Sequence, residues 1–301
     1  MQSENQFIHL PILESKGITL AVKREDELHP FISGNKYRKL KYNLQEAKKE
    51  NIDTLLTFGG AFSNHILATA VAGKEKSFKT IGIIRGDELR DKWHTNPTLK
   101  LAHKNGMQFK FVSREVYRTK EQEDFITDLK SEFGSFYLIP EGGTNALAIK
   151  GCEEILTDSD TDFDVVCTCV GTGGTVAGLI NSAKPEQQII GFSTLKGNFL
   201  ENEIKKWVYK NNWQLNTDYH FGGYGKVTAE LVEFINSFRI ETGISLDPIY
   251  TGKMIFGLLD RVKNDSFVTG TNILAIHTGG LQGIAGMNMI LKKKNLPLLR
   301  L

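Results

Sequence analysis

The architecture of this chain follows from one stretch, DVVCTCVGTGGTVAG, which covers residues 164–178. An apolar run of strand length leads into a glycine-rich turn, and small apolar residues suited to a helix follow. Strand, turn and helix in this order form the repeating unit of a parallel α/β sheet. Because side chains alternate along a strand, Cys167 and Cys169 share one face, which predicts small core residues rather than metal ligands.

Similar units recur on both sides of this stretch. Apolar runs that end in glycine or polar turns are separated by helix-length segments, which predicts parallel sheets. The runs expected in one sheet are 54–58, 80–84, 108–112 and 136–139, and those expected in a second sheet are 18–22, 165–170, 189–192 and 273–276.

The predicted fold class is therefore α/β, with two lobes that each hold a mostly parallel open sheet flanked by helices. The turn-forming segment PEGGTN at 140–145 precedes a helical stretch at 146–156 and marks a lobe boundary near residue 150. The expected lobes are a larger one, residues 1–45 and 151–301, and a smaller one that closes a cleft, residues 46–150.

Charge and composition exclude several classes of protein. With 37 Lys and Arg against 35 Asp and Glu, the formal net charge is +2, and no basic stripe suited to nucleic acid stands out. The N-terminal residues lack the basic-then-apolar order of a signal peptide, and no apolar run approaches the roughly 20 residues needed to cross a bilayer. We therefore expect a soluble cytoplasmic protein that binds neither nucleic acid nor membranes.

A lysine and a glycine loop together indicate the chemistry. Lys36 lies in SGNKYRKL, residues 33–40, where a turn containing glycine opens an amphipathic helix. The loop at 171–175 enters a helix, so its free N–H groups and two hydroxyls converge on one point where a phosphate fits. A lysine amine fixed at a helix start, together with a separate phosphate anchor, is what pyridoxal phosphate chemistry requires.

Glycine-rich loops of this kind also occur in nucleotide sites and in tight strand–helix packing. A dinucleotide-binding loop needs G-x-G-x-x-G and an acidic residue after the next strand, but that strand runs into Ser193 and Thr194. A Walker loop needs Lys followed by Ser or Thr after its second glycine, and the sequence has neither there. Glycines that serve only tight packing between strand and helix remain an alternative.

The loop GGAFSNH at 59–65 follows another expected strand. Ser63 or Asn64 is a natural helix N-cap, and the free N–H groups there attract an anion such as a substrate carboxylate, although plain capping would look the same. His65 would either contact a ligand or close the turn.

Two further loops add hydroxyl groups. The segment at 247–253 places Tyr250 just after a strand-like stretch, although a tyrosine beside an Asp-Pro turn also serves packing. The expected strand at 273–276 is followed by His277, Thr278 and two glycines.

These motifs occur in the order found in a known family. The chain resembles the fold-type-II pyridoxal phosphate enzymes, and within them the group that contains 1-aminocyclopropane-1-carboxylate deaminase and D-cysteine desulfhydrase. The resemblance runs from about residue 10 to residue 286. It rests on KRED at 23–26, GNKYRK at 34–39, SNH at 63–65, GTGGT at 171–175, DPIYTGK at 247–253 and HTGG at 277–280.

The resemblance implies a role for each matched position. Lys36 would bond covalently to the cofactor and later act as general base, Asn64 would hydrogen-bond the ring hydroxyl, and Thr278 would face the pyridine nitrogen. The implied phosphate ligands are Gly171, Thr172, Gly173, Gly174 and Thr175. The implied catalytic residues are Lys36, Ser63, Tyr224 and Tyr250, and the residues around the substrate are Ser63, Asn64, His65, Tyr224, Tyr250 and Thr251.

The expected function is that of a pyridoxal phosphate-dependent lyase acting on a small amino acid. His65, Thr251 and Thr278 resemble the desulfhydrase branch, so the first expectation is β-elimination of D-cysteine to pyruvate, ammonia and hydrogen sulfide. The alternative is 1-aminocyclopropane-1-carboxylate deaminase, which yields 2-oxobutanoate and ammonia. Phe62 stands where both branches usually have Gln, which predicts an altered substrate pocket. A homodimer is expected by the same resemblance.

Two other classes of protein compete with this expectation. An oxidoreductase could bind a nicotinamide or flavin dinucleotide at the glycine loop, but the acidic partner for the ribose is missing. A non-catalytic two-lobe module could bind an amino acid or a phosphorylated metabolite. Such a module would not need an ionisable lysine at the seam between the lobes.

Overall fold

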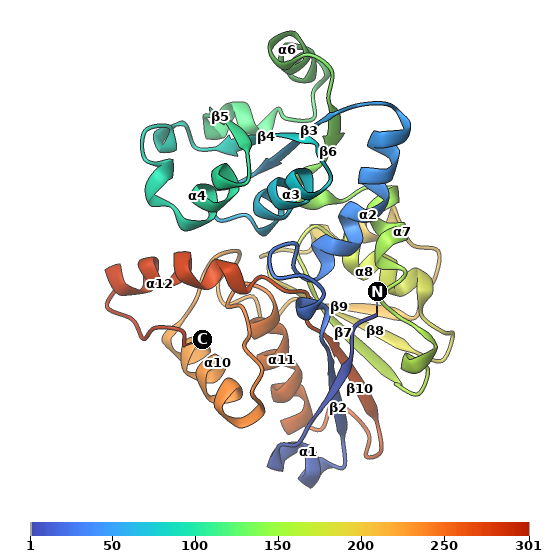
Figure 1. Cartoon of the computed structure of the whole chain (residues 1–301). Helices are drawn as coiled ribbons and strands as arrows, with labels where there is room; N and C mark the ends of the chain where they lie inside the picture. The colour runs from blue at the N-terminus through green and yellow to red at the C-terminus, as the bar shows by residue number, and fades with distance from the viewer. Residues whose placement is uncertain (1, 301) are drawn as a thin grey trace.

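The computed structural model describes residues 2–300 and shows two separate sheets, each covered by helices on both faces (Figure 1). The larger sheet has the order β1-β2-β10-β7-β8-β9, and the smaller one has the order β5-β4-β3-β6. Neighbouring strands run parallel, except that β1 and β2 are antiparallel. The predicted α/β class is therefore confirmed. The strands are β1 (Asn5–Ile8), β2 (Thr19–Lys23), β3 (Thr54–Gly59), β4 (Lys79–Arg85), β5 (Met107–Val112), β6 (Tyr137–Ile139), β7 (Val165–Val170), β8 (Gln188–Ser193), β9 (Trp213–Asn216) and β10 (Asn272–Ile276).

Two hydrophobic clusters cover the faces of the larger sheet. In β7, Cys167 and Cys169 contribute to one cluster and Val166 and Val170 to the other, as the alternation along a strand requires. Both cysteines are thus core residues, as predicted. The cysteine face is covered by α1 (Pro11–Lys16), α10 (Ala229–Thr242), α11 (Thr251–Lys263) and α12 (Ile284–Lys293), and the opposite face by α7 (Ala146–Cys152), α8 (Gly174–Ser182) and α9 (Phe199–Lys205).

The smaller sheet is built in the same way. In β3, Leu55 packs into one cluster, whereas Leu56 and Phe58 pack into the other. The first cluster includes α2 (Asn35–Lys49), α3 (Asn64–Glu75) and α4 (Pro97–Lys104), and the second includes α5 (Arg114–Arg118) and α6 (Glu123–Phe133).

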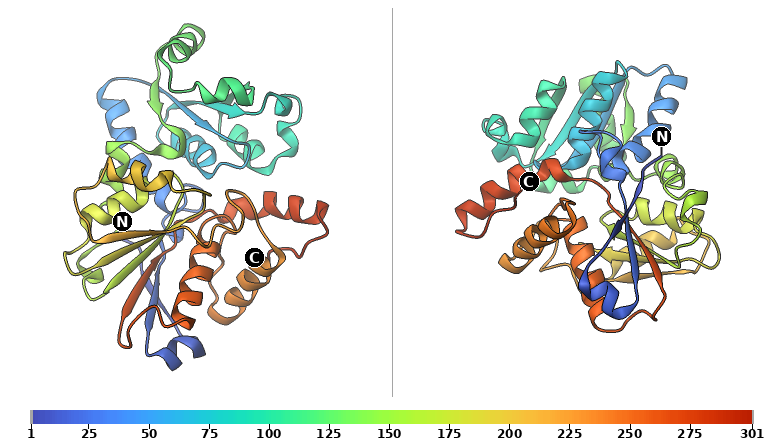
Figure 2. Two further views of the ribbon diagram at one scale, coloured as in Figure 1. Left: turned by 180° about the vertical axis from the view of Figure 1, so that it is seen from behind. Right: turned by 60° about the horizontal axis from the view of Figure 1, so that its bottom comes forward.

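Two helices connect the lobes. α2 packs along α7 so closely that a Cβ atom on Gly151 would lie 2.1 Å from the Arg38 carbonyl oxygen. α12, red in Figures 1 and 2, contacts α4 of the smaller lobe. Along residues 2–300, no helix is long and apolar enough to cross a membrane.

Each of the eight predicted strands is present, with ends displaced by at most one residue. The parallel pairing of β2 with β10 confirms that the strand near residue 20 belongs to the second sheet. The lobe boundaries at residues 45 and 150 stay a prediction.

Four features differ from the sequence-based expectation. The edge strands β1 and β9 were not predicted, because both are half exposed and neither has an apolar run. The stretch before Asp247 is not a strand; Ile244 and Leu246 are buried there without pairing to a sheet. α7 ends at Cys152 rather than at residue 156, because the next backbone hydrogen bonds tighten to residues three apart.

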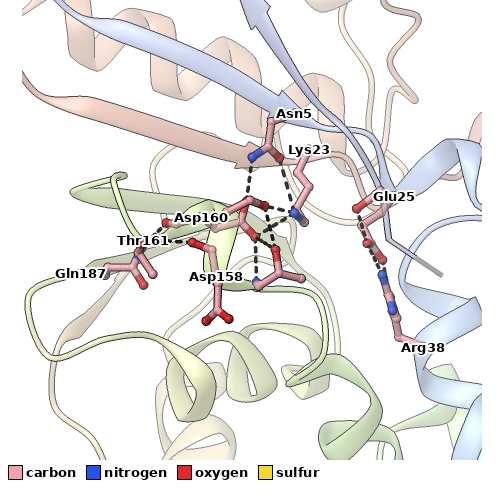
Figure 3. A network of polar contacts seen from close by, with 11 residues as sticks. Asn5, Lys23, Glu25, Arg38, Asp158, Asp160, Thr161 and Gln187 are labelled. Carbon is pink, nitrogen blue, oxygen red and sulfur yellow. Dashed lines mark hydrogen bonds and ion pairs between the residues drawn. The ribbon is translucent and has the colours of Figure 1, made fainter.

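A buried ion pair ties β2 to the turn before β7 (Figure 3). Lys23 Nζ lies 2.8 Å from Asp160 Oδ2, and both side chains are 1% exposed. The second carboxylate oxygen accepts a hydrogen bond from Asn5 at 2.7 Å, and the Thr157 backbone N–H donates to Oδ2 at 2.8 Å. Every oxygen of this buried carboxylate therefore has a partner, which a buried charge requires.

A second buried pair joins the end of β2 to α2 (Figure 3). Arg38 donates from Nε and Nη2 to the two Glu25 carboxylate oxygens at 2.8 and 2.7 Å. This two-pronged geometry fixes the direction of the guanidinium as well as its distance. It therefore orients the first turns of α2.

Removal of one member of the Lys23–Asp160 pair should be strongly destabilising, because the remaining charge would be buried without a partner. We expect Lys23→Met to lower the free energy of unfolding by about 3–5 kcal/mol. Lys79→Met breaks an exposed pair with Asp53 and should cost at most about 1 kcal/mol. Urea denaturation of both variants measures the difference, and equal costs would contradict this account.

Candidate active site

The carboxyl ends of strands from both sheets meet at a cavity of about 440 Å³. Parallel sheets place their loops at this edge, where ligands of such folds bind. Of the site residues predicted from the sequence, all except Gly174 and Thr251 line the cavity.

The start of α2 is held between two of these loops. Gly34 has φ of 58°, and a Cβ atom there would lie 2.0 Å from the Thr278 carbonyl oxygen, so no side chain fits. The Asn35 N–H donates to that carbonyl at 3.3 Å, and the Asn35 side chain donates to Thr175 Oγ1 at 2.8 Å. Lys36, one residue later, is thereby fixed at the cavity.

Two lysine amines share one carbonyl at the cavity wall. Lys36 Nζ and Lys39 Nζ donate to the Gly142 oxygen at 3.2 and 3.1 Å. Burial, together with the Lys39 charge, lowers the pKa of Lys36 to about 7. A large fraction of Lys36 is thus neutral near pH 7, which a nucleophile or general base requires.

The glycine loop begins α8 without a side-chain cap. Gly173 is the N-cap residue with φ of 86°, and no side chain accepts a hydrogen bond from the first turn. The first N–H groups of a helix have no intrahelical partner, so they can bind an anion. Gly174 does not line the cavity, because it is the buried first residue of α8.

Lys39 adds a positive charge to this anion site, a role that sequence reasoning missed. Its Nζ donates to Thr144 Oγ1 at 2.9 Å and lies 3.5 Å from Thr172 Oγ1. A Cβ atom on Gly174 would be 3.1 Å from the same nitrogen. The spacing from Lys36 was a usable signal, since residues three apart lie on one face of a helix.

The loop after β3 supplies a second helix start. Ser63 caps α3 by accepting from the Ile66 N–H at 3.4 Å, and Asn64 Oδ1 accepts from Gln282 at 3.1 Å. The predicted cap is therefore confirmed at Ser63. Phe62 lies on the same loop, and its ring sits where a Cβ atom on Gly286 would approach within 2.5 Å.

His65 is buried and lines the cavity. Its Nε2 lies 2.8 Å from Thr57 Oγ1, which donates its own proton to the Ile139 carbonyl. Nε2 therefore carries the imidazole proton, and Nδ1 is an acceptor with no partner among residues 2–300. Burial and the nearby lysines hold the pKa of His65 well below its usual value, so the ring is neutral.

Two tyrosines form one wall of the cavity. The rings of Tyr224 and Tyr250 meet edge to face with centroids 6.1 Å apart. A Cβ atom on Gly171 would come within 3.1 Å of the Tyr250 ring, so a side chain there would require this ring to shift by a few tenths of an ångström. Burial raises the pKa of Tyr250 well above its usual value, so its phenol is neutral.

Thr251 differs from its predicted placement. Its side chain is fully buried, and its hydroxyl donates to Asp247 Oδ1 at 2.8 Å instead of lining the cavity. The Asp247 carboxylate also accepts from the backbone N–H groups of Ile249, Tyr250 and Thr251. Thr251 therefore shapes the turn that carries Tyr250 and does not face a substrate.

Thr278 faces the cavity from the loop after β10. Its Oγ1 lies 3.0 Å from Cys169 Sγ. Burial raises the pKa of Cys169 to about 12, so the thiol is protonated and leaves this end of the cavity without charge.

Arg85 and Glu141 also line the cavity and were not predicted. Glu141 accepts from Tyr117 at 2.8 Å and lies 3.4 Å from Lys120, whereas Arg85 has no ion pair with any residue between 2 and 300. Arg85 is the last residue of β4, and the preceding residue, Ile84, pairs with Gly59 at the end of β3. Arg85 therefore lies at the carboxyl edge of the smaller sheet. The rule that ligands bind beyond the carboxyl ends of strands was therefore a signal for this arginine.

The arrangement fits a phosphorylated aldehyde. The uncapped start of α8 and Lys39 suit a phosphate, and the Lys36 amine at the same wall suits an aldehyde. Nδ1 of His65 is a buried acceptor left open, and Asn64 and Thr278 offer further polar groups. These groups line one cavity of about 440 Å³, so a single small molecule could contact all of them.

Comparison with known proteins identifies the family. The model of the family "Pyridoxal-phosphate dependent enzyme" matches residues 3–279. A Pyrococcus abyssi protein with the provisional name 1-aminocyclopropane-1-carboxylate deaminase is 33% identical, over 93% of this chain and 90% of its own. The Arabidopsis thaliana "Bifunctional D-cysteine desulfhydrase/1-aminocyclopropane-1-carboxylate deaminase, mitochondrial" is 30% identical, over 89% of this chain and 74% of its own.

A solved structure agrees with this result. The crystal structure of an "ACC deaminase homologue" superposes with a TM-score of 0.83 at 30% identity, covering 97% of this chain and 94% of the other. The two alternatives, a dinucleotide-dependent oxidoreductase and a non-catalytic binding module, are therefore set aside, and the predicted cofactor is confirmed. The chain belongs to the pyridoxal phosphate-dependent enzymes of fold type II, in the family of 1-aminocyclopropane-1-carboxylate deaminase and D-cysteine desulfhydrase.

Proposed function

We propose that this enzyme is a D-cysteine desulfhydrase that releases hydrogen sulfide, pyruvate and ammonia. The main support is Lys36, whose amine faces the cavity with a pKa lowered to about 7 and with the glycine loop beside it. β-Elimination needs one such base and a leaving group on the substrate.

Pyridoxal phosphate, when bound, supplies an aldehyde that links to amines and a conjugated ring that stabilises negative charge at the adjoining carbon. Lys36 would hold the cofactor and, once displaced by the substrate amine, remove the proton from the substrate α carbon. Lys39, Thr172 and Thr175 would hold the phosphate at the start of α8.

The substrate carboxylate has a suitable binding place at the loop after β3. The N–H groups at the start of α3 and the Arg85 guanidinium, which has no ion pair within residues 2–300, give this part of the cavity a positive potential. A Cβ atom on Gly60 would lie 3.6 Å from Arg85 Nη2, so the guanidinium lies beside this loop. We infer that both groups orient the amino acid.

The elimination of D-cysteine consumes one molecule of water and needs no other reactant. The Cα–H bond and the Cβ–S bond break, the sulfur leaves as thiolate and gains a proton, and hydrolysis of the remaining enamine gives pyruvate and ammonia.

Ring opening of 1-aminocyclopropane-1-carboxylate is the second candidate, and relatives with that name support it. That reaction needs a nucleophile or an additional base, for which Ser63 and Tyr250 are the candidates. However, Ser63 caps α3, and the raised pKa keeps Tyr250 a neutral phenol. These two observations favour elimination. A homodimer in the cytoplasm stays a prediction.

Lys36→Ala should abolish turnover, because it removes the base and the covalent link to the cofactor. We expect sulfide release to fall by at least about 10²–10⁴-fold and the visible absorption band of the bound cofactor to disappear. Lys49→Ala changes an exposed lysine at the far end of the same helix and should behave as wild type. Retention of both the band and turnover in the Lys36 variant would refute the assignment.

The rate of covalent cofactor uptake by the cofactor-free protein should depend on the neutral form of Lys36. Since its pKa is lowered to about 7, the rate should rise with pH below 7 and level off above it. Lys39→Met removes a neighbouring positive charge, so the levelling should move to higher pH. Stopped-flow absorbance between pH 6 and 9 measures this, and a rate that climbs steadily to pH 9 in wild type would disagree.

A substrate screen decides between the two reactions. We expect equal amounts of sulfide, pyruvate and ammonia from D-cysteine, pyruvate and ammonia from β-chloro-D-alanine, and no 2-oxobutanoate from 1-aminocyclopropane-1-carboxylate. Tyr250→Phe should keep sulfide release within about tenfold, because the phenol proton is not needed for the base step. Formation of 2-oxobutanoate without sulfide would establish the second candidate instead.

A further inference from the structure

A second buried lysine lies outside the chemistry described so far. Lys253, on the first turn of α11, is 1% exposed. Its Nζ donates to the His220 carbonyl at 2.9 Å and to the Gly223 carbonyl at 3.0 Å, and it forms no ion pair within residues 2–300. An ammonium group loses its hydration when it is buried. The hydrogen bonds to these two carbonyls, which belong to one loop, offset part of that loss.

The loop that Lys253 holds contains three glycines with positive φ. Gly222, Gly223 and Gly225 have φ of 89°, 113° and 70°, a region that glycine enters without strain. The loop also has internal hydrogen bonds, from Gly223 N–H to the His220 carbonyl at 3.0 Å and from Gly222 N–H to His220 Nδ1 at 2.8 Å. Lys253 bonds the carbonyls on both sides of this turn and connects it to α11.

Tyr224 is the residue that this loop presents. It directly follows Gly223, lines the cavity and remains 48% exposed, so burial alone does not fix it. Its ring meets Tyr250, which is the N-cap residue of α11. One helix therefore contacts the loop twice, through the Lys253 amine and through the Tyr250 ring.

We propose that Lys253 is a positioning residue whose ammonium ties the loop 220–225 to α11 and so holds Tyr224 against Tyr250 at the wall of the substrate cavity. The statement that the substrate lies beside Tyr224 rests on the proposed function. The contact between Lys253 and the loop is independent of that function. Burial lowers the pKa of Lys253 to about 8, and the ammonium form still predominates at pH 7.

Hydrogen–deuterium exchange of the cofactor-loaded enzyme tests the tie without measuring turnover. In wild type, peptides covering residues 219–226 should be protected at pH 7. Lys253→Met should speed their exchange about tenfold or more and leave peptides of the smaller lobe unchanged. Lys253→Gln keeps N–H donors and should restore part of the protection.

Lys23→Met is the matched control, because Lys23 is also 1% exposed and buried with hydrogen-bond partners. This variant should lower the melting temperature without changing exchange at 219–226. Unprotected exchange of this segment in wild type would overturn the proposal, even if neither Lys253 variant folds. Equal protection in wild type and Lys253→Met would also overturn it.

A double-mutant cycle tests the consequence for substrate binding. Lys253→Met and Tyr224→Ala should each raise KM for D-cysteine more than they lower kcat, and together they should cost little more than one alone. Additive effects would overturn the positioning role of Lys253. Absence of sulfide release in wild type would instead contradict the proposed function and leave the exchange result valid.

Discussion

The backbone contact between Gly34 and Thr278 is the constraint on which the site depends. With a Cβ atom excluded at Gly34, the start of α2 lies directly on the loop after β10, and Asn35 reaches the glycine loop of α8. Lys36 is the next residue, so its amine has little freedom to lie elsewhere. The Arg38–Glu25 pair fixes the same helix within its first turn. The contacts of Gly34, Asn35 and Arg38 thus fix the position of the Lys36 amine.

The pKa of the Lys36 amine depends on its burial and on the nearby Lys39. Lys36 and Lys39 are both buried and share the Gly142 carbonyl, and burial lowers the pKa of each. Without an anion this arrangement is unfavourable, because two like charges compete for one acceptor. A phosphate at the start of α8 would offset the charge of Lys39. Burial is the larger cause of the lowered Lys36 pKa, and the Lys39 charge adds to it.

Periodicity predicted the fold well because the central strands are buried on both faces and read as continuous apolar runs. It failed at β1 and β9, whose half-exposed residues carry no such signal, and at Ile244 and Leu246, which are buried without strand pairing. Most of the site residues predicted from motifs line the cavity, because loops after parallel strands share one edge. They did not predict Lys39 or Arg85, and they misplaced Thr251, whose hydroxyl serves Asp247. The helical spacing of Lys39 and the position of Arg85 at a strand end were usable signals, whereas the Thr251–Asp247 hydrogen bond follows from a local turn geometry that the motif does not specify.

The cavity wall combines the elements around Lys36 with the loop after β3. Lys36 follows Gly34 closely, and the contact of Gly34 with the Thr278 carbonyl leaves no room for a side chain. Phe62 lies on the loop after β3, and its ring rests against Gly286 of α12. An aromatic ring there offers the cavity apolar surface and no hydrogen-bonding group, whereas the glutamine that the family resemblance leads us to expect would offer an amide. The Phe62 ring therefore makes this part of the cavity wall apolar.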